Sequence, residues 1–101
     1  MNWEVEITDE AMVELESQFK TGLLTKEDAA IIKAWRAEMQ ANGPDRLREN
    51  RLWDDHDLDA EWRGYRSSCF SPRGRIIYRI FRERIVVEIV KVTGSHDYKK
   101  K

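Results

Sequence analysis

The chain has 101 residues, enough for one domain with a single hydrophobic core over residues 1–101. Its 18 Lys and Arg and 19 Asp and Glu give a net charge of −1, which provides no general attraction to nucleic acid. One cysteine excludes an internal disulfide, and no Cys/His spacing suggests zinc, so we expect no cofactor and no metal site. No apolar run suits a membrane span or a signal peptide, so we expect a cytoplasmic protein.

The charge is unevenly distributed along the chain. Residues 1–42 carry nine acidic and four basic side chains, whereas residues 62–101 carry eleven basic and three acidic ones. Such asymmetry indicates a face that binds nucleic acid, although arginines also line the solvated faces of ordinary sheets.

The first 42 residues have the pattern of one strand and two helices. Alternating apolar and charged residues over 3–7 predict a half-buried strand. Thr8 or Asp9 can cap a helix that ends at Gly22. Thr25 and Asp28 have the spacing of a capping box for a second helix, which Gly43 and Pro44 stop after residue 42. The two helices should form an antiparallel hairpin.

The second half of the chain predicts three strands. Residues 45–61 are polar and lack a period, so we expect an irregular connection with a short helical turn over 46–52. Aromatic and β-branched residues dominate 62–70, 75–81 and 85–93, with turns at 71–74 and 82–84. The order β-α-α-β-β-β predicts an α+β fold, with an antiparallel sheet packed on an N-terminal helical hairpin.

The faces of these strands depend on their register. If Phe70 pairs with Arg75, one open, basic face carries Arg66, Ser68, Arg75 and Arg79. Under this register the face beneath the helices carries Tyr65, Cys69, Ile76, Tyr78 and Ile80. A slip of one residue reverses the assignment for the slipped strand.

Four blocks in the second half carry a resemblance to a known family. They are DHDL at 55–58, EWRGYR at 61–66, GRIIYR at 74–79 and VTGSH at 92–96. In this order they resemble the RelE/ParE toxin superfamily, and within it the YafQ-like and RelE-like mRNA interferase toxins of type II toxin–antitoxin systems. The resemblance implies a RelE-like fold, a cognate antitoxin partner, and cleavage of mRNA on the ribosome.

The resemblance also implies roles for individual residues. His96 and His56 match active-site histidines, and Arg75 matches an arginine that stabilises the scissile phosphate. Arg66 matches a position that holds the RNA backbone. The expected RNA-binding set is completed by Arg63, Arg79, Tyr98 and Lys99. Cys69 and Arg73 stand where YafQ-like toxins carry a histidine and an aspartate, so the set is a hybrid with the arginine-based RelE type.

The chemistry of RNA cleavage without a metal fits these residue types. The 2′-hydroxyl attacks the neighbouring phosphorus, so one group must remove its proton and another must protonate the leaving 5′-oxygen. Histidine suits either proton transfer near neutral pH, and the planar fork of arginine suits the phosphate. The chain has only two histidines, and both lie in the matched blocks.

Two other functions remain open from the sequence. A ParE-like toxin would inhibit DNA gyrase by binding it, and such members lack the histidine and arginine set. A non-catalytic module could instead bind RNA or the ribosome through the basic sheet.

Overall fold

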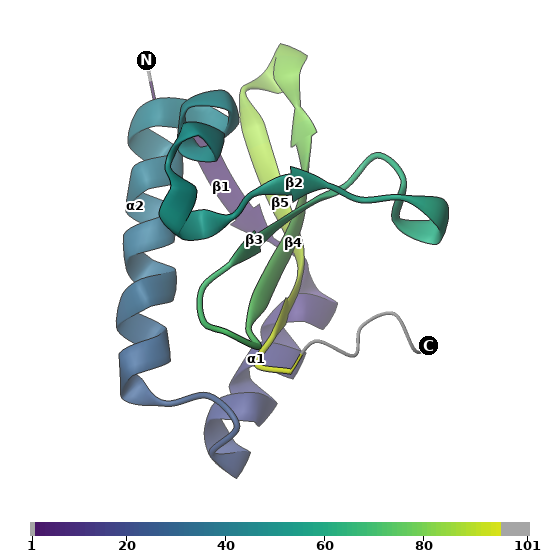
Figure 1. Cartoon of the computed structure of the whole chain (residues 1–101). Helices are drawn as coiled ribbons and strands as arrows, with labels where there is room; N and C mark the ends of the chain where they lie inside the picture. The colour runs from purple at the N-terminus through teal and green to yellow at the C-terminus, as the bar shows by residue number, and fades with distance from the viewer. Residues whose placement is uncertain (1, 96–101) are drawn as a thin grey trace.

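The computed structural model describes residues 2–95, so the predictions on His96, Tyr98 and Lys99 lie outside the described residues. These described residues form two α-helices, three short 3₁₀ helices and five strands (Figure 1). In chain order the strands and α-helices are β1 (Glu4–Ile7), α1 (Asp9–Thr21), α2 (Lys26–Glu49), β2 (His56–Asp57), β3 (Arg66–Cys69), β4 (Arg75–Phe81) and β5 (Val86–Thr93). The α+β fold with an N-terminal helical hairpin is confirmed. None of the described helices is both long and apolar enough to cross a membrane.

The five strands form one sheet in the order β1-β5-β4-β3-β2. β5, β4, β3 and β2 are antiparallel neighbours, but β1 lies parallel to β5, with Val5 opposite Val87 and Ile7 opposite Ile89. The sheet is therefore mixed, and the predicted fully antiparallel sheet is wrong in this respect. The connection between these two parallel strands contains both helices and strands β2 to β4. β2 is a second addition, within the connection that we expected to be irregular.

α1 begins and ends where the sequence predicted, and α2 begins there. The side chain of Thr8 accepts a hydrogen bond from Ala11 N (3.1 Å), and Gly22 ends α1 in the left-handed region at φ 85°. Thr25 and Asp28 form the reciprocal capping box at the start of α2. These caps satisfy backbone groups that a helix end leaves without partners.

A sharp break divides α2 at Gly43, whose φ of 84° and ψ of 171° are not helical. Pro44 then starts a second helical segment, a position where its missing N–H costs nothing. The predicted stop at Gly43 and the predicted helical turn after it are both confirmed. A Cβ atom at Gly43 would lie 2.5 Å from Trp3 Nε1, so the break also lets β1 and α2 approach closely.

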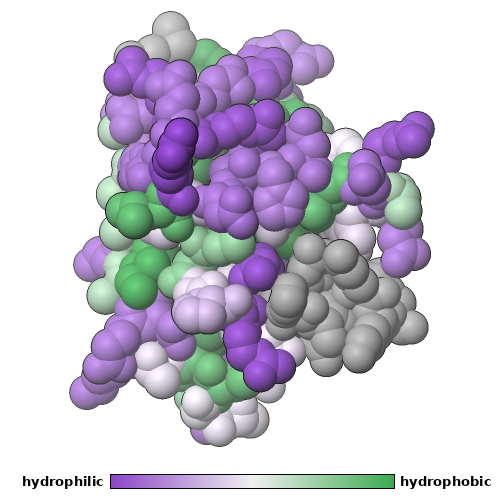
Figure 2. All heavy atoms as spheres, in the orientation of Figure 1, coloured by the Kyte–Doolittle hydropathy of each residue, from purple (hydrophilic) through white to green (hydrophobic). Residues whose placement is uncertain are grey.

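The core lies between the helices and one face of the sheet. Trp35 and Tyr78 meet edge to face, with ring centroids 5.5 Å apart. Both are completely buried, as are Met39, Leu47, Ile76 and Val87. Figure 2 shows a surface that is mainly hydrophilic on this side of the molecule, with smaller hydrophobic patches. Leu52, in the chain before β2, is an exposed hydrophobic side chain.

α1 protects the part of β5 that β1 does not reach. The side-chain amide of Gln18 donates to Val92 O (2.7 Å) and accepts from Gly94 N (2.8 Å). A single side chain thus makes the two hydrogen bonds that a neighbouring strand would make. This contact fixes the end of β5 against α1.

Candidate active site on the open face of the sheet

The register between β3 and β4 decides which side chains reach the open face, which is the face away from the helices. Arg66 lies opposite Tyr78, Ser68 opposite Ile76, and Cys69 opposite Arg75. The predicted pairing of Phe70 with Arg75 is wrong by one residue. Gly74 closes the turn early, because its N–H bonds both the carbonyl (3.2 Å) and the hydroxyl (2.8 Å) of Ser71.

Directly opposite residues share a face, so the register shift moves all of β3. Arg66 and Ser68 lie on the helix-covered face, and Cys69 lies on the open face; the predicted faces of these three residues are wrong. The faces predicted for β4 are right: Ile76 and Tyr78 are buried under the helices. Arg75 and Arg79 alternate with them and belong to the open face.

The open face brings together residues from three strands. His56 on β2 lies opposite Ser67 on β3, and Ser67 lies opposite Ile77 on β4. Arg75 and Arg79 lie two residues to either side of Ile77. From ordinary strand spacings, the Cα atom of His56 is about 12 Å from that of each arginine. Ser67 and Ile77, which lie between His56 and the two arginines on this face, are themselves completely buried.

The imidazole of His56 is held by one ring nitrogen. Nδ1 lies 2.8 Å from the carbonyl oxygen of Asp54, which can only accept a hydrogen bond, so Nδ1 carries the hydrogen. The side chain is otherwise exposed. Nε2 is therefore the ring nitrogen that can exchange a proton with a bound molecule.

The two open-face arginines are oriented by different contacts. Arg75 donates from one Nη to the carbonyl of Gly74 (2.9 Å), and more weakly to those of Ser71 and Pro72 (3.4 Å each). Arg79 donates from Nε to Glu88 (2.9 Å), and its guanidinium lies over the ring of Tyr65. A guanidinium has five N–H donors, and these contacts use only some of them, so each arginine can also bind an anion.

Arg66, predicted to bind RNA, is mostly buried and lies on the helix-covered face. Only 7% of the residue is exposed. Its Nη2 donates to Pro44 O (2.7 Å), and its Nε and Nη2 both contact Asp55 Oδ1 (3.0 and 2.8 Å). The guanidinium is therefore held inside the protein by the chain's own acceptors.

Sequence reasoning missed the partner of Arg66. The carboxylate of Asp55 is completely buried and accepts hydrogen bonds from the hydroxyls of Ser68 and Tyr78, each at 2.6 Å. Arg48 approaches it at 3.4 Å. Asp55 stands in a run of acidic residues that is typical of a solvated loop, and no local pattern marks it as buried.

A cavity of about 600 Å³ adjoins the site where β3 begins and β4 ends. Its lining includes Tyr65, the carboxylates of Asp45 and Asp57, and five arginines. The arginines are Arg48, Arg63, Arg66, Arg79 and Arg82. Hydrogen bonds from Arg82 and Arg48 lower the pKa values of Asp45 and Asp57, respectively. The sequence predicted Arg63 and Arg79 here as RNA-binding residues and missed Arg48 and Arg82.

Cys69 also lies on the open face, opposite Arg75. Burial raises the pKa of its thiol, which lies 3.7 Å from the carboxylate of Asp54. The thiol therefore stays protonated at neutral pH, and a thiolate nucleophile is not available there.

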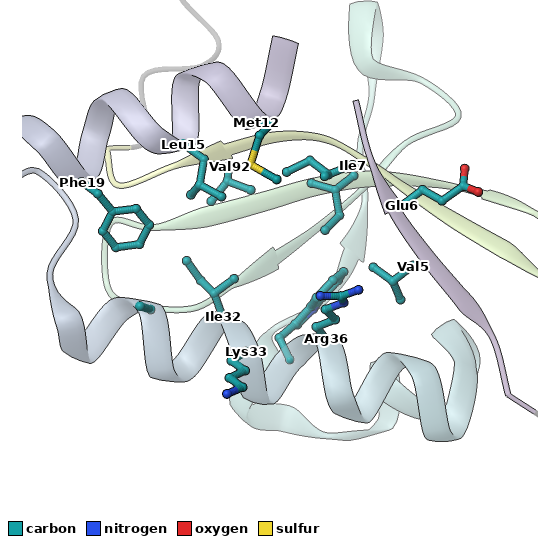
Figure 3. Close-up of a pocket in the computed structure, with 13 residues that line it drawn as sticks. Val5, Glu6, Ile7, Met12, Leu15, Phe19, Ile32, Lys33, Arg36 and Val92 are labelled. Atoms are coloured by element: carbon teal, nitrogen blue, oxygen red, sulfur yellow. The ribbon is translucent and has the colours of Figure 1, made fainter. Parts of the chain in front are cut away.

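A second hollow, of about 440 Å³, lies between the two helices and the β1–β5 edge of the sheet (Figure 3). Leu15 and Phe19 of α1 face Ile32 of α2 across it, and Lys33 and Arg36 lie on its α2 side. Its lining is mainly apolar and has no histidine or cysteine, so it suits an apolar segment of chain better than RNA. Across residues 2–95, no cluster of three His, Cys, Asp or Glu side chains is placed to hold a metal.

Comparison with known proteins finds no matching family model and no matching curated protein. Solved structures do match. YafQ in the E. coli DinJ–YafQ toxin–antitoxin complex has a TM-score of 0.75 at 17% identity, covering all of both chains. In the Staphylococcus aureus YoeB–YefM complex the match has a TM-score of 0.67 at 13% identity, covering 92% of this chain and 97% of the other.

A copper-bound mutant toxin from Helicobacter pylori has a TM-score of 0.73 at 12% identity, covering 96% of this chain and 97% of the other. The alignments cover nearly the whole of this chain and nearly the whole of each matched chain. The protein therefore has the RelE-like toxin fold of YafQ and YoeB.

Proposed function

We propose that this protein is the toxin of a type II toxin–antitoxin system and an endoribonuclease that cleaves mRNA without a metal ion. The observation that carries the proposal is that His56, held at Nδ1, shares the open face of the sheet with Arg75 and Arg79, about 12 Å away from Cα to Cα. A histidine can make one of the two proton transfers that cleavage through the 2′-hydroxyl needs, and arginines can bind the phosphate. The RelE-like toxin fold supports the same conclusion.

In this reaction the 2′-oxygen forms a bond to phosphorus and the bond from phosphorus to the 5′-oxygen breaks. One group takes the proton of the 2′-hydroxyl and the other protonates the leaving oxygen. We assign these two transfers to His56 and His96. Arg75 stabilises the charge that develops on the phosphate. The product is a 2′,3′-cyclic phosphate or the 3′-phosphate formed by its hydrolysis.

The neighbouring arginines give the RNA a path across the protein. Arg79 and Arg63 belong to the cavity beside the site and bind flanking phosphates in this proposal. Tyr65 offers an aromatic ring on which a base can stack. Tyr98 and Lys99 add contacts at the C-terminal end of the domain. Because this acid–base set is small, we expect an mRNA already positioned in the ribosome to be the substrate.

The proposal is tested by inducing the protein in bacterial cells and mapping new mRNA 5′ ends. We expect growth arrest and cuts within translated codons, and both should be lost in His56→Ala, His96→Ala and Arg75→Ala. Arg46→Ala is the matched control, because Arg46 is an exposed arginine on the helical segment away from the open face. Growth arrest without new ends would reject the ribonuclease and favour binding to gyrase or the ribosome.

We also propose a cognate antitoxin that places the apolar face of an amphipathic helix in the hollow between α1 and α2, a groove shown in Figure 3. The groove is apolar, and Lys33 and Arg36 beside it fit acidic side chains on such a helix.

Phe19 is 37% exposed and lines the groove, whereas Val13 is exposed on the same helix but outside it. Phe19→Glu should abolish neutralisation by the co-expressed antitoxin and keep toxicity; Val13→Glu should be neutralised normally. Equal neutralisation of both would reject this surface.

A further inference from the structure

The strand that carries His56 has little to hold it by itself. β2 contains two residues, which pair with Ser67 and Arg66 of β3. Both side chains of β2 are exposed, so the strand buries no apolar surface of its own. Two residue pairs at the edge of a sheet are weak, and another contact must fix this segment.

That contact is the buried carboxylate of Asp55, one residue before His56. Its two oxygens accept from Ser68, Tyr78 and Arg66 at 2.6 to 3.0 Å, and these partners belong to β3 and β4. Burial and the neighbouring charge of Asp55 raise the pKa of Tyr78, so its hydroxyl keeps its proton and donates. The carboxylate thus ties the segment to the two strands that form the open face.

Arg48 forms ion pairs with the residues on either side of His56. Its Nη2 contacts Asp57 at 2.7 Å and its Nε contacts Asp55 at 3.4 Å. The residues on both sides of His56 are therefore bound to one guanidinium from α2. Since side chains alternate along a strand, His56 must point away from this network toward the open face.

The backbone before Asp55 completes the arrangement. Asp54 adopts the left-handed region, at φ 44° and ψ 46°. This conformation is uncommon for a residue other than glycine and persists where the surroundings fix it. It places the Asp54 carbonyl 2.8 Å from His56 Nδ1.

We propose that Asp55 is the positioning residue of His56, holding the histidine with Nδ1 bonded to Asp54 and Nε2 presented on the open face. This inference deepens the proposed function and rests on it for its catalytic meaning. Asp55 does not touch RNA; it acts through the orientation of His56.

The orientation can be measured without any activity assay. Imidazole ¹⁵N chemical shifts report which ring nitrogen carries the hydrogen, and the His96→Ala spectrum identifies the signals of His56. At about pH 9, where histidine is neutral, we expect the Nδ1–H tautomer, although free histidine prefers the other one. Asp55→Asn should lose this preference. Asp59→Asn is the matched control, since Asp59 is exposed and its side chain makes no capping bond.

A second variant covers the case in which Asp55→Asn does not fold. Tyr78→Phe keeps the ring against Trp35 and removes only the hydroxyl that bonds Asp55. We expect it to shift the His56 tautomer in the same direction and by a smaller amount. If the folded variants keep the wild-type tautomer, Asp55 does not position His56.

Kinetics separate the inference from the function on which it rests. In Asp55→Asn, kcat for RNA cleavage should fall about 10- to 100-fold, as expected for a misplaced acid–base group. KM should change little, because Arg75 and Arg79 are untouched. An unchanged kcat would overturn the inference. A third outcome is also distinguishable: Asp55→Asn loses the Nδ1–H tautomer, but the wild-type protein cleaves no RNA. In that case Asp55 still positions His56, and the proposed function is rejected.

Discussion

Tyr78 joins the apolar core to the polar network below the open face. Its ring packs against Trp35, and its hydroxyl donates to Asp55. Burial is the larger cause, and the charge of Asp55 the next, of a pKa raised well above the usual value of 10.0. A phenolate there would face a carboxylate at hydrogen-bond distance, which the folded state cannot tolerate.

This geometry predicts how the stability of the protein depends on alkaline pH. Above pH 10 the unfolded chain ionises Tyr78 and the folded chain does not, so the free energy of unfolding falls. The slope from this residue is about 1.4 kcal/mol per pH unit. Tyr78→Phe removes the titrating group and should flatten the curve by that amount, although its stability at neutral pH is lower. Urea denaturation of both proteins from pH 9 to 11 measures the difference, and parallel curves would contradict the assignment.

At the scale of the elements, two glycines that end helical segments are constrained in different ways. Gly22 has φ 85° and ψ 3°, and a Cβ atom there would meet nothing within 4 Å. Gly43 has φ 84° with ψ 171°, a region open only to glycine, and a Cβ atom would press on Trp3. The break at Gly43 also aims Pro44 and Arg48 at the network of Asp55.

The two glycines therefore make a matched pair of variants. Gly22→Ala should lower the free energy of unfolding by about 1 kcal/mol, the cost of the left-handed region. Gly43→Ala adds a steric contact and should cost about 3 kcal/mol or more, which lowers Tm by at least 10 °C or so. Thermal denaturation followed by circular dichroism compares them. Similar losses in both would mean that Trp3 moves aside freely.

The elements also show what the sequence can and cannot predict. Caps and breaks depend on a few neighbouring residues, and Thr8, Gly22, Thr25 and Gly43 act as predicted. The parallel pairing of β1 with β5 joins residues some 80 positions apart, and no local pattern encodes it. β2 is too short to show a period.

The candidate site was predictable to a different degree on each strand. On β4, alternation alone placed Arg75 and Arg79 correctly. On β3, one residue of turn length reversed the faces of Arg66 and Cys69. Asp55 was missed because the burial of a carboxylate depends on donors from three distant segments, which come together only in the folded chain.

On the scale of the whole molecule, the open face concentrates positive charge in a chain whose net charge is −1. RNA binding should therefore depend on local arginines and on salt, despite the acidic remainder. Each phosphate contact contributes about 0.7 to the slope of log affinity against log salt for a single strand. Substituting Gln for Arg75, Arg79 or Arg63 should lower the slope by about that amount, and Arg46→Gln should leave it unchanged. A 2′-O-methyl RNA, which cannot be cleaved, allows the measurement, and unchanged slopes would contradict the proposed RNA path.

The position of β5 has a consequence for the synthesis of the protein. Among the strands of residues 2–95 it is the last to be made, yet it lies inside the sheet between β1 and β4. Until residues 86–93 have been added, β1 has no partner and the core beneath the helices stays open on one side. A nascent chain can form the helical hairpin and the β3–β4 hairpin early, but it cannot join them. Folding of the sheet, and with it the assembly of the open face, must follow the synthesis of this strand.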